Sequence, residues 1–179
     1  APGQVAPAGA AGEQFPLGGP SIGGPVVEQY LDRIDRIAVG RAPGPVRVAH
    51  TSLHGVGDQL LSSALGRLPG IEAHAVAAQR APDPDFPTVA SPNPEEPGTL
   101  DQLLDLAASI DADVALALDP DADRLAVALP RLVAGHRRWQ QLTGDQVGAL
   151  LAADLIATSA GPDRLVGATG VSSRLVAAI

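Results

Sequence analysis

An uninterrupted run of apolar residues, from Val114 to Leu118, constrains the fold more than any other feature of this sequence. A run of this length without polar alternation is typical of a strand buried on both faces of a parallel sheet. Aromatic residues make up only 2% of the chain, against 45% hydrophobic residues in all, so the core must consist mainly of Ala, Val, Leu and Ile side chains. Such a core suits the layered interior of an α/β protein.

A strand–helix–strand pattern lies upstream of this run. Residues 45–50 predict a strand, residues 58–68 predict a helix that ends before Pro69, and residues 71–77 predict a second strand. A helical connection between two neighbouring strands makes them parallel, and its crossover is right-handed. We therefore expect a βαβ unit in this part of the chain.

Three further segments have helical periodicity. They are 26–38, which Pro25 opens, 100–110, with Thr99 as N-cap, and 144–157, with Thr143 as N-cap. The apolar residues of 100–110 share one face, as in an amphipathic helix.

The remaining segments predict short strands and loops. Residues 125–129 predict a strand that pairs with the apolar run as a hairpin, and residues 164–168 predict another strand before a helix capped by Ser172. Residues 82–97 contain six prolines, which predict a semi-rigid surface loop without regular structure. Residues 1–25 are rich in Gly and Pro, and we interpret them as a linker or the remnant of a preceding domain.

Charge and composition exclude several classes of function. The net charge is −8 and all twelve basic residues are Arg, which argues against a nucleic-acid partner because no basic stripe is available to displace counterions. The chain has no Cys, so it forms neither a disulfide framework nor a thiolate metal site. No apolar run approaches the roughly 20 residues that a membrane-spanning helix needs. These observations predict a protein without a membrane partner and are compatible with the cytoplasm.

An acidic turn follows the apolar run directly, with carboxylates at Asp119, Asp121 and Asp123 and a guanidinium at Arg124. Three carboxylates at alternate positions of a tight loop can converge on one point, where a divalent cation offsets their mutual repulsion. Ligand oxygens favour magnesium, manganese or calcium over zinc. The end of a strand is also the usual place for ligand sites in open α/β sheets, which favours a metal site over a solvated acidic turn.

Two other kinds of aspartate loop can be compared with this turn. An EF-hand is excluded, because counting from Asp119 its loop requires Gly where Arg124 stands and Glu where Pro130 stands. A haloacid-dehalogenase-type phosphatase also places an aspartate pair after a strand. That family favours Thr or Val where this chain has Asp123, so the phosphatase is the weaker interpretation.

Four motifs, in order along about 51–174, resemble the α-D-phosphohexomutases, which include phosphomannomutases and phosphoglucomutases. In that family the metal loop has the pattern Asp-Gly-Asp-x-Asp-Arg, with Pro in place of Gly in one branch. The matching segments here are Asp119 to Arg124, Thr51-x-x-His54-Gly55-Val56-Gly57, the proline loop Pro82 to Gly98, and Leu142-Thr143-Gly144-Asp145-Gln146-Val147-Gly148.

The resemblance implies a three-layer α/β/α domain with a mixed, mostly parallel sheet, plus the start of a second similar domain. Residues 1–25 would then be a linker or the remnant of the first domain. Residues 26–135 would form the metal-binding second domain, and residues 136–179 the truncated start of the third, sugar-recognition domain. The apolar pattern at the C-terminus stops without a breaker, and we expect this chain to be an interior fragment.

The activity implied by the resemblance is that of an intramolecular phosphotransferase. Family members move a phosphoryl group between C6 and C1 of a hexose phosphate through a phosphoserine and a hexose bisphosphate. The resemblance assigns Mg²⁺ binding to Asp119, Asp121 and Asp123 and places Arg124, as a catalytic residue, beside the reacting phosphate. Such chemistry depends mainly on positioning and charge stabilisation, which a metal clamp supplies.

The chain departs from the family where the phosphoserine loop would be, because no Thr-Ala-Ser-His-Asn-Pro sequence occurs. Ser91 is a poor substitute, since it lies in the proline loop with nothing nearby to act as its base. We therefore expect no phosphoserine in this chain and no turnover by the fragment without the missing domains of the same polypeptide. Gly170, where relatives favour Ile, weakens the last predicted strand.

The histidines and the single tryptophan carry weaker predictions. His54 can approach the metal loop from the neighbouring turn as a possible second-shell residue, although a structural role in the turn is the favoured interpretation. The other histidines, His50, His74 and His136, have no partner pattern. Trp139 predicts a core or domain-joint position, because no second aromatic accompanies it for stacking on a sugar.

Two functions remain in competition at the level of the sequence. One is the phosphohexomutase, with the sugar left open among mannose, glucose, glucosamine and pentose phosphates. The other is a non-catalytic α/β module that binds a metal or a protein partner. Faces that contact the missing domains are expected to be exposed, which predicts a sticky or marginally stable fragment.

Overall fold

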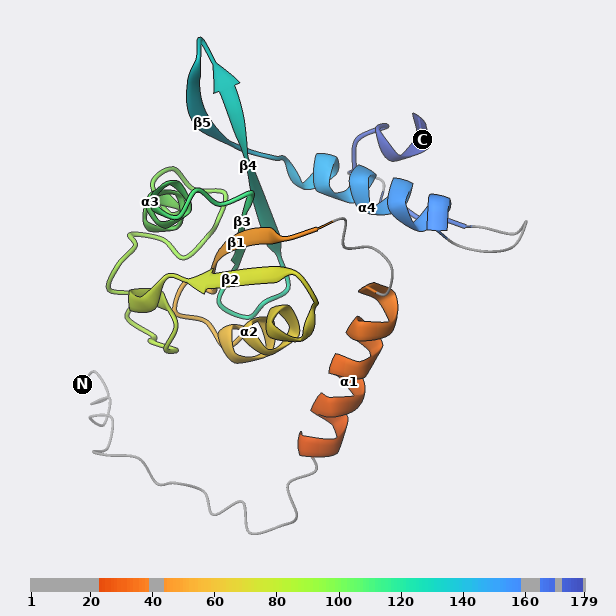
Figure 1. The fold of residues 1–179 in the computed structure, drawn as a ribbon, viewed down its shortest axis with the longest axis horizontal. Coiled ribbons are helices and arrows are strands. Elements are labelled where there is room, and N and C mark those ends of the chain that lie inside the picture. Colours follow the sequence, from red (N-terminus) through yellow and green to blue (C-terminus); the bar gives the residue numbers. More distant parts are fainter. Residues whose placement is uncertain (1–22, 39–43, 159–164, 170–171, 179) are drawn as a thin grey trace, which may run out of the picture.

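The computed structural model describes residues 23–38, 44–158, 165–169 and 172–178 (Figure 1). Its centre is a five-stranded sheet in the order β2-β1-β3-β4-β5. β1 is parallel to β2 and β3, and β4 is antiparallel to β3 and β5, so four strands share one direction. The strands are β1 (Val46–Thr51), β2 (Ile71–Ala75), β3 (Val114–Leu118), β4 (Leu125–Val133) and β5 (His136–Gln141).

Among the described residues, four α-helices flank or follow this sheet, and they confirm the helices predicted at 26–38, 58–68, 100–110 and 144–157. α2 packs on β2, and α3 packs on β1 and β3. Because both crossovers are right-handed while the chain moves outward to β2 and then back past β1, α2 and α3 cover opposite faces of the sheet (Figure 1). The helices are α1 (Gly23–Ala38), α2 (Asp58–Arg67), α3 (Asp101–Ser109) and α4 (Gly144–Thr158), with short 3₁₀ turns η1 (Ala77–Gln79) and η2 (Val176–Ala178). The predicted α/β class and the mixed sheet are therefore confirmed.

The core between the sheet and α3 is built from small aliphatic side chains. Leu103 and Ala107 of α3 pack against the buried alanines of the central strands, among them Ala115 and Ala117. The other side chains of β3 are only half-buried. The prediction of a strand buried on both faces is thus only partly correct, since one face of β3 is more open than a continuous apolar run implies.

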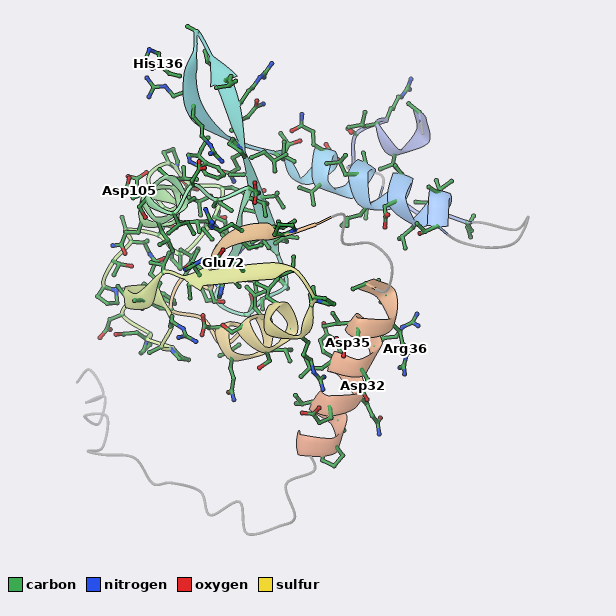
Figure 2. The ribbon with its side chains drawn as sticks, viewed as in Figure 1. Asp32, Asp35, Arg36, Glu72, Asp105 and His136 are labelled. Atoms are coloured by element: carbon green, nitrogen blue, oxygen red, sulfur yellow. The ribbon has the colours of Figure 1, made fainter. Side chains whose placement is uncertain are left out.

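The α1 helix is attached to α2 by an apolar anchor and by charge. Leu31 is buried, and Arg67 of α2 forms ion pairs with the α1 carboxylates Glu28, Asp32 and Asp35. In Figure 2, Asp35 lies on the side of α1 that faces α2, whereas Arg36 points away on the other side. Surface ion pairs contribute little to stability, so Leu31 is the main attachment.

The fifth strand was not predicted. β5 pairs along its whole length with β4, with Trp139 opposite Pro130, and Trp139 packs partly buried against the core. Its polar residues suit an exposed edge strand, and for that reason they gave no apolar signal. The boundary expected at residue 135 falls in the β4–β5 turn, and the division of the chain into domains stays a prediction.

Three local predictions are wrong. Thr99 does not cap α3, because its hydroxyl donates to the Ser91 carbonyl and the helix begins after Leu100 without a side-chain cap. Within the predicted strand 164–168, the described residues form no strand, and only the short turn η2 follows Ser172. Residues 1–22, Arg164 and Gly170 lie outside the described residues.

Thr143, by contrast, caps α4 as predicted. Its hydroxyl accepts from the Gln146 backbone N–H at 3.2 Å, and the Gln146 side chain accepts from the Thr143 N–H at 2.9 Å. This reciprocal pair satisfies two N–H groups at the start of the helix. In the part of the chain that the structure describes, no helix is long and apolar enough to cross a bilayer.

His50, one of the histidines without a partner pattern, is buried in β1. Burial lowers the pKa of His50, an effect that the charge of Asp58 opposes and that Arg80 and His74 reinforce. The neutral imidazole is therefore the form that the folded chain prefers. In the unfolded chain the imidazole titrates near its ordinary pKa of 6.5.

Acidification is consequently expected to destabilise the fold through His50. Below the unfolded pKa the unfolded chain binds the proton more readily, so the free energy of unfolding falls as the pH drops through 6.5 and levels off below the folded pKa. Urea titrations between pH 8 and pH 5 measure this slope. A His50→Gln variant should have a smaller slope than the exposed control His136→Gln, and equal slopes would contradict the prediction.

Candidate metal centre

The acidic turn brings its three carboxylates together at the end of β3. Asp119 is fully buried, while Asp121 and Asp123 are exposed. One carboxylate oxygen from each of them lies within 4.8 Å of the others, and among the described residues no other such acidic or histidine cluster occurs. The strand-terminal bend thus gathers the aspartates that the sequence singled out.

Arg124 holds the first aspartate of the loop. Its backbone N–H donates to Asp119 Oδ1 at 3.0 Å, and its Nε donates to Asp119 Oδ2 at 2.7 Å. Burial raises the pKa of Asp119, but these hydrogen bonds outweigh burial and hold the pKa below its usual range. Asp119 is therefore ionised and fixed in direction before any cation arrives.

The exposed members of the cluster repel one another. A hydrogen bond with Asp119 and the negative charges of Asp121 and Asp119 raise the pKa of Asp123. Carboxylates that destabilise each other's ionised form are the arrangement that a hard divalent cation relieves. With oxygen donors only, the set fits magnesium or manganese better than zinc.

A neighbouring turn, residues 51–57, supports this loop from β1. The N–H of Val56 donates to the Pro120 carbonyl at 2.9 Å. A Cβ on Gly55 would lie 2.3 Å from Pro120 Cα, and a Cβ on Gly57 would lie 3.0 Å from Ala122 Cβ. Because β1 and β3 are adjacent and parallel, their carboxyl ends bring turn and loop together at one edge of the sheet. Both glycines are needed for this close approach.

The proline loop also reaches the centre. Arg124 Nη1 donates to Asn93 Oδ1 at 3.2 Å, and Gln141 Nε2 donates to the Pro94 carbonyl at 3.0 Å. These residues line a cavity of about 210 Å³ that extends to Gly144 at the start of α4. The sequence did not predict that Asn93 and Gln141 share a cavity with Arg124. Asn93 does lie in the proline loop, one of the segments that resemble the phosphohexomutases.

His54 belongs to the supporting turn, and its ring is directed to the proline loop. His54 Nε2 lies 2.8 Å from Thr88 Oγ1, and the residue is buried. His54 Nε2 is therefore hydrogen-bonded to Thr88, and the backbone of Gly55 and Val56 makes the contact with the metal loop. This geometry agrees with a structural role in the turn, and a second-shell role stays a prediction.

Comparison with known proteins shows the family. Residues 28–132 match the model of the phosphoglucomutase/phosphomannomutase alpha/beta/alpha domain II. The chain belongs to the phosphoglucomutase/phosphomannomutase family. The family that the motifs predicted is thus confirmed, and the matched range includes the aspartate loop, the supporting turn and the proline loop.

Curated relatives in this family carry several sugar names. The chain is 38% identical over 154 residues to a probable phosphomannomutase of Haemophilus influenzae, covering 86% of this chain and 31% of that protein. It is 45% identical over 107 residues to the phosphopentomutase of Homo sapiens, covering 59% of this chain and 17% of that one. The chain therefore spans less than a third of the length of these relatives.

A solved structure agrees in fold. A phosphoglucomutase/phosphomannomutase family protein from Burkholderia thailandensis superposes with a TM-score of 0.59 at 24% identity, covering 74% of this chain and 26% of that one. This likeness supports the architecture of the domain.

Proposed function

We propose that this chain supplies the magnesium-binding part of a phosphosugar mutase, which moves a phosphoryl group between C6 and C1 of a hexose phosphate through a phosphoserine and a bisphosphate intermediate. The observation that supports this most is the convergence of three carboxylates within 4.8 Å in a chain of this family. The serine and the sugar-binding groups would come from other domains of the same polypeptide. The fragment by itself is expected to be inactive.

Within this function the aspartates of the loop and Arg124 would have different roles. Asp119, Asp121 and Asp123 would hold the ion, and bound Mg²⁺ supplies positive charge that neutralises a phosphate. Arg124, half-exposed and fixed by Asp119 on one side and Asn93 on the other, presents a guanidinium toward the cavity beside the loop. A guanidinium held in this way can orient a phosphoryl group without a large loss of side-chain entropy.

The choice of sugar stays open. The named relatives include a probable phosphomannomutase and a phosphopentomutase, whose names refer to different sugars. A non-catalytic metal-binding module remains the competing proposal. Mutase activity of the whole parent protein that is lost on changing Asp121 would exclude that alternative.

A magnesium titration tests the proposal on this chain directly. Asp121→Asn replaces one of the three proposed carboxylate ligands, an exposed one, by a neutral amide. The affinity for Mg²⁺ is expected to fall about tenfold or more, which corresponds to roughly 1.4 kcal/mol. Isothermal calorimetry measures the affinity, with Asp105→Asn on α3 as a matched exposed control that leaves it unchanged (Figure 2). Equal affinities of the wild type and Asp121→Asn would refute the metal site.

A further inference from the structure

A chain of hydrogen bonds, buried at Thr51 and Gln79 and part-buried at Thr88, runs beneath the turn that supports the metal loop. It joins the end of β1, the η1 turn and the proline loop, so it ties together three separate segments. Its links are Thr51 Oγ1 to Gln79 Oε1 at 2.6 Å, Gln79 Nε2 to Thr88 Oγ1 at 2.9 Å, and Thr88 Oγ1 to His54 Nε2 at 2.8 Å. Polar groups that are paired in this way and largely shielded from water rigidify the backbone around them.

The turn above this chain has a backbone conformation that needs support. Leu53 and His54 have φ values of 46° and 61°, in the left-handed region that side chains other than glycine rarely adopt. Such residues persist only where their surroundings hold them. The Leu53 N–H donates to Thr51 Oγ1 at 3.0 Å, and the His54 N–H donates to the Gln79 carbonyl at 3.0 Å. The same residues that form the chain therefore hold the turn.

The turn contacts the metal loop directly, so a constraint on the turn also acts on the loop. Gly55 touches the Pro120 backbone, and the N–H of Val56 donates to the Pro120 carbonyl at 2.9 Å. Pro120 lies between Asp119 and Asp121. A shift of the turn would therefore change the separation and direction of these two carboxylates.

We infer that Gln79 and Thr88 are positioning residues for the metal loop, although neither belongs to it. They act through the turn, with Thr88 bonded to His54 and Gln79 bonded to both Thr51 and Thr88. The expected effect on metal affinity rests on the proposed function, in which the loop binds a metal. The expected effect on the rigidity of the aspartate loop does not depend on a metal, because the Thr88 hydroxyl acts on the loop through the turn.

A Thr88→Val variant tests the inference, because it removes the hydroxyl while nearly keeping the side-chain volume. Two quantities are measured: Mn²⁺ affinity by electron paramagnetic resonance, and hydrogen–deuterium exchange of residues 52–56 and 119–124 in metal-free protein. We expect Mn²⁺ affinity to fall about tenfold and exchange to rise in both segments but not in β2 or α3. Thr88→Ser should restore both values, and the exposed control Thr169→Val should change neither.

Other outcomes separate the inference from the function on which it rests. Thr88→Val with a lower melting temperature but unchanged exchange at 119–124 would make Thr88 merely structural and overturn the inference. Faster exchange in a chain whose wild type binds no Mn²⁺ would support the positioning role while refuting the metal function. If Thr88→Val fails to fold, Gln79→Met breaks the same chain one link earlier, and unchanged exchange at 119–124 in that variant would equally overturn the inference.

Discussion

Gly55→Ala is expected to damage the fold and the metal loop together. The added Cβ would lie 2.3, 2.4 and 2.6 Å from the Cα, O and C atoms of Pro120, all of which belong to the backbone. No side-chain rotation relieves such a contact, so the turn and the loop must move apart. Overpacking costs 1–3 kcal/mol where side chains can adjust, and we expect about 3 kcal/mol or more here because the backbone must move. The displaced loop should also lose most of its affinity for Mg²⁺.

Gly66→Ala is the matched control for this substitution. Gly66 lies inside α2, and a Cβ there would meet nothing within 4 Å. Alanine is favoured over glycine in a helix, and because Gly66 is the penultimate residue of α2 this variant should be at most about 0.5 kcal/mol more stable than the wild type and bind Mg²⁺ unchanged. Urea unfolding and calorimetry measure the two effects. If both variants behaved alike, Gly55 would not be a contact point between turn and loop.

The fold could be predicted where neighbouring residues in the chain carry the signal. The periodicity of 58–68 and 144–157 and the apolar run at 114–118 depend on local propensity and patterning, and these elements form as expected. β5 has five polar or basic residues and only one residue, Trp139, that packs against the core. Its strand conformation comes from pairing with β4, a tertiary contact that no local pattern displays. Thr99 failed as a cap for a similar reason, since its hydroxyl is used by the distant Ser91 carbonyl.

The candidate site divides in the same way. The three aspartates were predicted because their spacing within one turn already places them near one another. The hydrogen bonds of their supports were not predicted, because each joins segments far apart in the chain: Asn93 and Arg124 are 31 residues apart, and His54 and Thr88 are 34 apart. Nothing in the order of residues along 82–97 indicates which side chain reaches which partner. The resemblance supplied those segments as motifs but gave no contact for them.

Asp119→Asn is expected to affect stability and metal binding, whereas Asp121→Asn should affect metal binding alone. Asp119 is fully buried and accepts from both Arg124 N and Arg124 Nε, while Asp121 is exposed. In the asparagine variant one oxygen becomes an NH₂ group that faces an Arg124 donor, and the remaining bond loses its negative charge. Hydrogen bonds to charged groups contribute about 1.5–3 kcal/mol, and because Arg124 is half-exposed we expect a loss near the lower end of that range.

Measuring both variants on both quantities makes the comparison decisive. Urea unfolding should place Asp119→Asn about 1–2 kcal/mol below Asp121→Asn in stability, while Mg²⁺ affinity falls in both. Equal stability of the two variants would mean that the Arg124 bonds to Asp119 do not hold the loop. A loss of stability without a loss of affinity would assign Asp119 to the scaffold and leave only Asp121 and Asp123 as ligands. The buried aspartate is thus the residue at which the structural and the chemical roles of this loop can be separated, because both of its carboxylate oxygens already accept hydrogen bonds from Arg124.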